Sequence, residues 1–154
     1  MFKTDLELIE IKDRPDFWHF GAPLVWEDEF NGEIVVPKGF ITDMASIPHA
    51  IDWLPNLDRD GISRRPAALH DWLYGGDRTR GKIAADIILR AALIAEGMGN
   101  IGAFEYWYAV HAFGQSSWDD DNANLRQEHF YTPEDWAAYL AALAQPATDP
   151  LPPS

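Results

Sequence analysis

The chain has 154 residues, of which 47% are hydrophobic and 24% charged, enough to bury the core of one domain. It has no cysteine, which excludes a disulfide framework, a thiol nucleophile and a thiolate zinc site. The 12 Lys and Arg against 25 Asp and Glu give a net charge of −13, which repels phosphate backbones, so we expect no nucleic-acid partner. No apolar run approaches the ~18 residues of a membrane span, so we expect no integral membrane protein. The first residues, 1–5, lack the apolar core of a signal peptide, so we do not expect secretion by that route.

The sequence before residue 60 favours β-strands. Its apolar runs are short, rich in branched and aromatic side chains, and separated by turn residues. The runs lie at 6–11, 17–20, 24–26, 34–36 and 40–41. Asn31-Gly32 separates two of them, and this dipeptide suits the positive φ angles of a tight hairpin turn.

After residue 60 the apolar residues follow helical spacing. We predict a helix that starts near Pro66 and ends at Gly75-Gly76, one capped by Thr79 and followed by Gly97, one from Ile101 to Phe113, and one that begins at Thr132-Pro133. The acidic residues at 119–121 are expected in a solvated loop. The predicted fold class is α+β, with a small N-terminal antiparallel β-sheet packed against a C-terminal helical half. Residues 1–144 form the single domain, and 145–154 form a Pro-rich tail.

The segment 36–48 carries the first candidate site residues. Thr42, Asp43 and Ser46 follow a predicted strand, which can display side chains from a rigid support. Asp43 could bind a metal or act as a base, and Ser46 could orient or attack a substrate. The alternative is that Asp43 and Ser46 bond to neighbouring backbone amides and shape a turn.

His70 and Asp71 form the second candidate pair. An imidazole and a carboxylate suit a metal site or acid–base chemistry, and His70 shares a helix face with Tyr74. The alternative is that His70 is an interior histidine with a hydrogen-bond partner, and that Asp71 pairs with Arg64 or Arg65.

Asp86 is the third candidate, because a carboxylate amid apolar neighbours is costly unless it has a partner. Lys82 and Arg90 lie four residues to either side, so a surface ion pair is one explanation. The other is that the turn at Gly75-Gly76 folds this helix back and brings Asp86 to His70, whose tautomer it would fix. His111 lies in an aromatic stripe at 104–111 that we expect to be mostly core.

These features resemble a known family, the DUF1353 proteins of bacteriophages, prophages and bacteria. The resemblance rests on Val-Pro-Lys-Gly-Phe-Ile-Thr-Asp-Met-Ala-Ser-Ile-Pro at 36–48, Ala-Leu-His-Asp-Trp-Leu-Tyr at 68–74, Asp86, the segment 108–114 and Trp118. It covers roughly residues 30 to 118. It implies a phage association and a shared pocket of polar residues, but no established reaction.

The leading hypothesis is a phage-encoded virion protein, at the tail, with a hydrolytic pocket for the host cell envelope. His70 would be a general base or metal ligand oriented by Asp86, with Asp43 or Asp71 completing the site and Ser46 positioning substrate. If a cofactor is used, it is a divalent metal ion held by His70, Asp43 and Asp86. The expected partners are phage structural proteins and the host cell wall. Synthesis takes place in the host cytoplasm, with incorporation into the virion as the expected destination.

Two alternatives assign no reaction to the protein. In one, the chain is a non-catalytic phage structural or interaction protein whose motif residues form a buried polar network, with Trp and Tyr side chains facing neighbouring subunits. In the other, it is an acidic inhibitor of a host factor, which rests on the net charge of −13.

Overall fold

The computed structural model describes residues 1–44, 61–120 and 125–145, and its N-terminal part forms two antiparallel sheets. The strands are β1 (Leu8–Ile11), β2 (Arg14–Phe20), β3 (Leu24–Asp28), β4 (Gly32–Val36) and β5 (Ile41–Thr42). One sheet has the order β1-β2-β5, and the other is the β3–β4 hairpin. The predicted turn is confirmed, because Gly32 follows Asn31 with φ at 71°.

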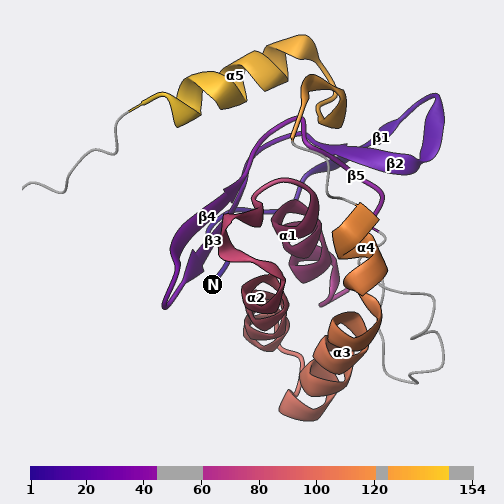
Figure 1. The fold of residues 1–154 in the computed structure, drawn as a ribbon, viewed down its shortest axis with the longest axis vertical. Coiled ribbons are helices and arrows are strands. Elements are labelled where there is room, and N and C mark those ends of the chain that lie inside the picture. The colour runs from indigo at the N-terminus through magenta and orange to yellow at the C-terminus, as the bar shows by residue number, and fades with distance from the viewer. Residues whose placement is uncertain (45–60, 121–124, 146–154) are drawn as a thin grey trace, which may run out of the picture.

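The rest of the described chain is helical, so the predicted α+β class is confirmed (Figure 1). The helices are α1 (Arg64–Gly75), α2 (Lys82–Ala95), α3 (Asn100–Phe113), α4 (Gln115–Asp120) and α5 (Pro133–Leu143), with 3₁₀ turns η2 (Arg78–Arg80) and η3 (Gln127–His129). None of the helices in the described ranges combines the length and apolarity that a membrane span requires.

The core joins these parts through α1. Figure 1 shows α1 between the strands and α2, with α2 between α1 and α3, and the contacts between these elements agree. Buried side chains of the strands, α1 and α2 form one cluster, in which Phe40 meets the edge of Trp72 with ring centroids 4.9 Å apart. A second cluster, with Leu89, Leu93 and Tyr106, holds α2 against α3. This stacking brings three helices close to one another.

The start of α2 differs from the prediction that Thr79 caps it. Thr79 lies inside η2, where its backbone N–H and hydroxyl bond to the carboxylate of Asp77. Gly81 then adopts φ 77°, a left-handed conformation that favours glycine, and α2 begins at Lys82. Lys82 therefore lies one helical turn before Asp86, on the same face.

The expectation of a loop at 119–121 is wrong for its first two residues. Asp119 and Asp120 are the last residues of α4. Asp119 accepts a hydrogen bond from Gln115 Nε2 at 2.9 Å, an i,i+4 contact that supports a short helix. Asp121 lies outside the described residues.

Helix α5 begins with a side-chain cap, and none of its residues is fully buried, while Trp136 and Tyr139 pack against the core. Thr132 Oγ1 accepts a hydrogen bond from the N–H of Asp135 at 3.1 Å, and Pro133 is the first helical residue. We expect Thr132→Ala to destabilise α5 by about 1 kcal/mol, which corresponds to roughly five-fold faster amide exchange there. Thr132→Ser, which keeps the hydroxyl, should exchange like the parent protein. Equal exchange in both variants would contradict the role of the cap.

Candidate functional site

Asp86 is fully buried, and four side chains from three helices donate hydrogen bonds to it. From α1, Tyr74 Oη (2.6 Å) and His70 Nε2 (3.0 Å) reach Oδ1. From α2 and α3, Lys82 Nζ (2.9 Å) and His111 Nδ1 (2.8 Å) reach Oδ2. The predicted approach of Asp86 to His70 is therefore confirmed. The ion pair with Lys82 is also confirmed, but it lies in the interior, with the Lys82 side chain 11% exposed.

The helical repeat explains why these groups meet. His70 and Tyr74 are four residues apart on α1, as are Lys82 and Asp86 on α2, so each pair shares one face. The α1–α2 contact turns these two faces toward each other. His111 lies in the last turn of α3, and its backbone oxygen accepts a further bond from Lys82 Nζ at 3.1 Å.

The hydrogen bonds keep Asp86 ionised. Burial by itself would raise the pKa of the carboxyl, but the bonds from His70, Tyr74, Lys82 and His111 together outweigh burial and hold the pKa well below 3.8. The Asp86 carboxylate and the Lys82 ammonium therefore form a buried pair of opposite charges.

His70 is neutral at neutral pH. Burial lowers the pKa of its imidazole below 6.5, and the attraction of Asp86 does not compensate for burial. An ionised carboxylate only accepts hydrogen bonds, so the proton of the neutral ring is on Nε2. With 1% of its surface exposed, His70 does not reach solvent, and its Nδ1 has no hydrogen-bond partner among the described residues.

His111, unlike His70, is partly exposed to solvent. Its Nδ1 must donate to Asp86, so in the neutral ring Nε2 carries a lone pair. The side chain is 41% exposed, and the ring stacks on Trp107 with centroids 5.2 Å apart. A buried carboxylate thus fixes the tautomer and orientation of an accessible imidazole, which is the arrangement of a general base.

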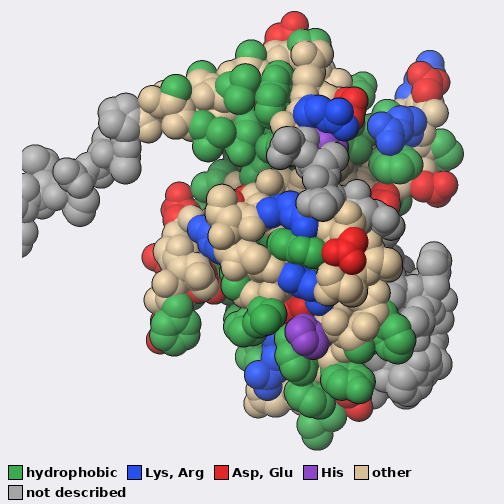
Figure 2. Space-filling model, in the orientation of Figure 1, with side chains coloured by type: hydrophobic (Ala, Val, Ile, Leu, Met, Phe, Trp, Pro, Cys, Tyr) green, Lys and Arg blue, Asp and Glu red, His purple; other side chains and the backbone are tan. Residues whose placement is uncertain are grey.

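An open pocket of about 540 Å³ lies in front of His111. Its lining residues are Arg80, Gly81, Lys82, Ile83, His111, Gln115 and Trp118. In Figure 2, Lys and Arg side chains gather in the middle of the drawn face, between the positions of α2 and α4 in Figure 1. The Asp86 network therefore has an enclosed side, with His70 and Tyr74, and an open side, with Lys82 and His111.

Arg78 fixes the Trp118 wall of this pocket. Its guanidinium lies 3.8 Å from the centre of the Trp118 ring and donates a hydrogen bond to the Trp118 backbone oxygen at 2.7 Å. The ring of Tyr74 meets Trp118 edge-on, with centroids 5.1 Å apart. Tyr74 thus connects the wall of the pocket to the Asp86 network.

The other predicted site residues lie elsewhere or are not described. Asp71 accepts a hydrogen bond from Thr42 Oγ1, and none of the Asp86 bonds involves Asp71 or Asp43. Asp43 is exposed and directly follows β5. Ser46 lies outside the described residues. Arg65, one of the two arginines considered as partners of Asp71, forms ion pairs with Asp5 and Glu96.

The predicted metal set of His70, Asp43 and Asp86 is not assembled. Among the described side chains, no group of three His, Asp or Glu is placed to hold a metal ion. Both oxygens of Asp86 already accept two hydrogen bonds each, and a metal would have to displace donors there. The donor set of this network thus favours proton chemistry over metal binding.

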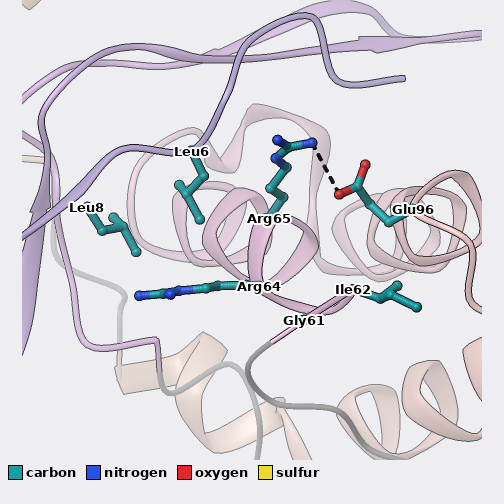
Figure 3. A pocket seen from close by; sticks show the side chains of 7 residues that line it. All are labelled: Leu6, Leu8, Gly61, Ile62, Arg64, Arg65 and Glu96. Atoms are coloured by element: carbon teal, nitrogen blue, oxygen red, sulfur yellow. Dashed lines mark hydrogen bonds and ion pairs between the residues drawn. The ribbon is translucent and has the colours of Figure 1, made fainter.

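A second pocket, of about 480 Å³, is shown in Figure 3. Leu6 and Leu8 line it from the N-terminal segment, and Arg64 and Arg65 from the start of α1. Arg65 is joined to Glu96 by an ion pair at 3.4 Å. Its described lining includes no histidine, whereas the other pocket is lined by His111 and Lys82, which bond to Asp86, so the pocket at His111 is the better candidate.

The family model for DUF1353, described as a protein of unknown function, matches residues 18–110. The match includes the end of β2, the strands β3 to β5, helices α1 and α2 and most of α3. It contains His70, Lys82 and Asp86, and it ends one residue before His111. No curated protein and no solved structure matches the chain. The family resemblance expected from the motifs is confirmed, and the chain belongs to the DUF1353 family.

Proposed function

We propose that this protein is a hydrolase in which His111, held by Asp86, activates a water molecule in the adjoining pocket. One observation carries the proposal: His111 Nδ1 bonds to the buried carboxylate at 2.8 Å while the side chain is 41% exposed beside the pocket. Asp86 would orient the catalytic histidine, which is the role expected from the sequence. The base is His111, because His70 is enclosed.

The chemistry needs one base and a source of positive charge. His111 Nε2 takes a proton from water, whose oxygen forms a bond to the acyl carbon of the substrate. The same proton then passes to the leaving nitrogen or oxygen as the acyl bond breaks. Lys82 and Arg80 line the same pocket as His111, and their positive charges stabilise the negative charge that develops on the carbonyl oxygen. No carboxylate belongs to the described lining, so an amide or ester fits better than a glycosidic bond, which requires two carboxyl groups.

The proposed setting is a bacteriophage particle. The protein would be encoded by a phage, carried at the virion tail and directed at peptide bonds of the host cell envelope. The motifs at 36–48 and 68–74 support this part, through their resemblance to phage and prophage proteins. Detection of the protein by mass spectrometry in purified particles of a phage that encodes it would test the setting separately from the chemistry.

His111→Asn tests the chemistry. Asparagine can donate from a position close to that of Nδ1 and so keeps the bond to Asp86, but it has no equivalent of Nε2. We expect at least about a 100-fold lower rate of release of soluble peptides from bacterial cell walls, with a melting temperature within a few degrees of the parent.

His129→Asn is the matched control. His129 lies in η3, where its Nδ1 accepts a hydrogen bond from the N–H of Arg126 that an asparagine oxygen can also accept. This variant should retain full activity. A His111→Asn protein that digests cell walls at the parental rate would exclude His111 as the base.

A second candidate function is that of a non-catalytic interaction protein. Helix α3 is apolar on all sides, and the side that does not pack against α2 exposes large apolar residues. Ile101 is 77% exposed, Phe104 50% and Tyr108 59%. Figure 2 shows hydrophobic side chains over α3 at the lower end of the drawn face. Under this candidate the Asp86 network is purely structural, and purified protein would digest no cell wall at any pH.

A further inference from the structure

The lining of the His111 pocket has an unusual charge composition for this chain. Among the residues that the structure describes, it includes Arg80, Lys82 and His111 and no Asp or Glu, whereas the whole chain has 25 Asp and Glu against 12 Lys and Arg. We infer that the pocket binds an anionic group, a carboxylate or a phosphate, which the substrate carries beside its scissile bond. The role of this anion in a substrate rests on the proposed function, whereas its binding does not.

Arg80 is the main anion-binding residue in this inference. A guanidinium has five N–H donors, and the bond to Asp77 uses one of them at Nη1. The Arg80 side chain is 23% exposed and lines the pocket, so its remaining donors are available to a ligand with two or three oxygen atoms.

Lys82 contributes one further donor. Its ammonium group has three N–H bonds, two of which are directed to Asp86 and to the backbone oxygen of His111. The third is left for a ligand. Because Asp86 and the His111 backbone hold Nζ in place, an anion would not have to restrict a freely moving lysine side chain.

The local charge balance permits an anion to approach. Arg78, Arg80 and Lys82 carry three positive charges. Among the described residues, the acids that bond to these side chains or to Gln115 are Asp77, Asp86 and Asp119. The formal charge here is therefore about zero, in a chain with a net charge of −13. None of these three acids is among the described lining residues, so the charged side chains described in the lining are basic.

The test uses inorganic phosphate and acetate as probes, with binding measured by isothermal titration calorimetry at low salt. We expect Arg80→Gln to weaken binding by about ten-fold or more, because a charged donor group is lost. Asp77→Asn should strengthen binding, because it releases Arg80 from its ion pair while an amide oxygen can still accept from Thr79. Opposite effects at the two ends of one ion pair are not expected from a general loss of stability.

Arg14→Gln is the matched control, because Arg14 is exposed and lies over the ring of Phe17 in β2, where it does not line this pocket. It should bind both probes like the parent. The stronger of phosphate and acetate identifies the class of anion. Absence of binding of either probe to the parent, or equal binding by the parent and Arg80→Gln, would overturn the inference.

The anion site and the hydrolase can fail separately. His111→Asn should lose hydrolysis and retain phosphate binding, since Arg80 and Lys82 remain. If phosphate binds through Arg80 but no cell wall is digested, the proposed function is wrong and the anion site stands. If digestion depends on His111 while Arg80→Gln changes neither KM nor phosphate binding, the anion site is wrong and the hydrolase stands.

Discussion

Asp86→Asn should lower the free energy of unfolding by about 3–5 kcal/mol, measured by urea denaturation at pH 7. The substitution keeps the shape of the side chain but removes its charge and one acceptor oxygen. Domains of this size have total stabilities of about 5–15 kcal/mol, so the variant should be close to unfolding at moderate temperature.

The reason lies in the four donors that converge on Asp86. Asparagine offers one oxygen and one NH₂ group, so the NH₂ must face either His70 and Tyr74 or Lys82 and His111. In either orientation two donors lose their acceptor. The ammonium group of Lys82, with its side chain 11% exposed, also loses its counter-charge in the interior.

Two further variants separate these effects. Asp13→Asn alters an exposed aspartate and should change stability by less than about 0.5 kcal/mol. In the double variant Asp86→Asn/Lys82→Met, the buried positive charge is gone as well. The double variant should therefore be more stable than the sum of the single effects predicts, by about 1 kcal/mol or more. Additive effects would show that Lys82 and Asp86 are not energetically coupled.

Part of this network could be predicted from the sequence. A carboxylate within an apolar helix needs a partner, and the glycine turn after the preceding helix limits the candidates to residues such as His70. The spacing of Lys82 from Asp86 predicted the ion pair. These inferences depend on local sequence and on two helices adjacent in the chain, where the short connection restricts the geometry.

His111 could not be placed in the same way. Helix α3 is apolar on all sides, with Tyr106 buried and Phe104 and Tyr108 exposed, so no polar stripe indicates which face lies against α2. The indirect signal was the number of donors that a buried carboxylate requires, since His70 and Lys82 alone leave it incompletely bonded. The helix at Asp119 was missed because it is supported by a bond between Gln115 and Asp119 and by contacts of Trp118 with residues outside the helix, which composition does not reveal.

The free energy of unfolding should also decrease as the pH is lowered, because of His70. Its pKa is below 6.5 in the folded protein, whereas the unfolded chain takes up a proton near the ordinary value of 6.5. The unfolded state therefore binds more protons in the interval between the two values. The contribution of neutral His70 is complete above pH 6.5 and is lost as the pH falls toward the folded pKa, by at most about 1.4 kcal/mol per pH unit.

The window for this measurement lies between pH 6.5 and 4.5, because the pKa of Glu27 is lowered from 4.5 by Lys3 and its contribution to stability begins to be lost there. The pKa of Asp86 is also lowered, and the stability that its ionised form provides is present in full above the unfolded value of 3.8. Acid loss from Asp86 thus begins only below this window, and the slope from His70 can be observed separately from it.

His70→Gln isolates that slope. Glutamine can donate to Asp86 from a position near that of Nε2, and it does not titrate. We expect urea midpoints at pH 7, 6 and 5 to fall for the parent and to fall less steeply for the variant. The same slope in both proteins would assign the acid sensitivity to other groups. A shallower slope would show that the enclosed side of the network stabilises the fold through a neutral histidine.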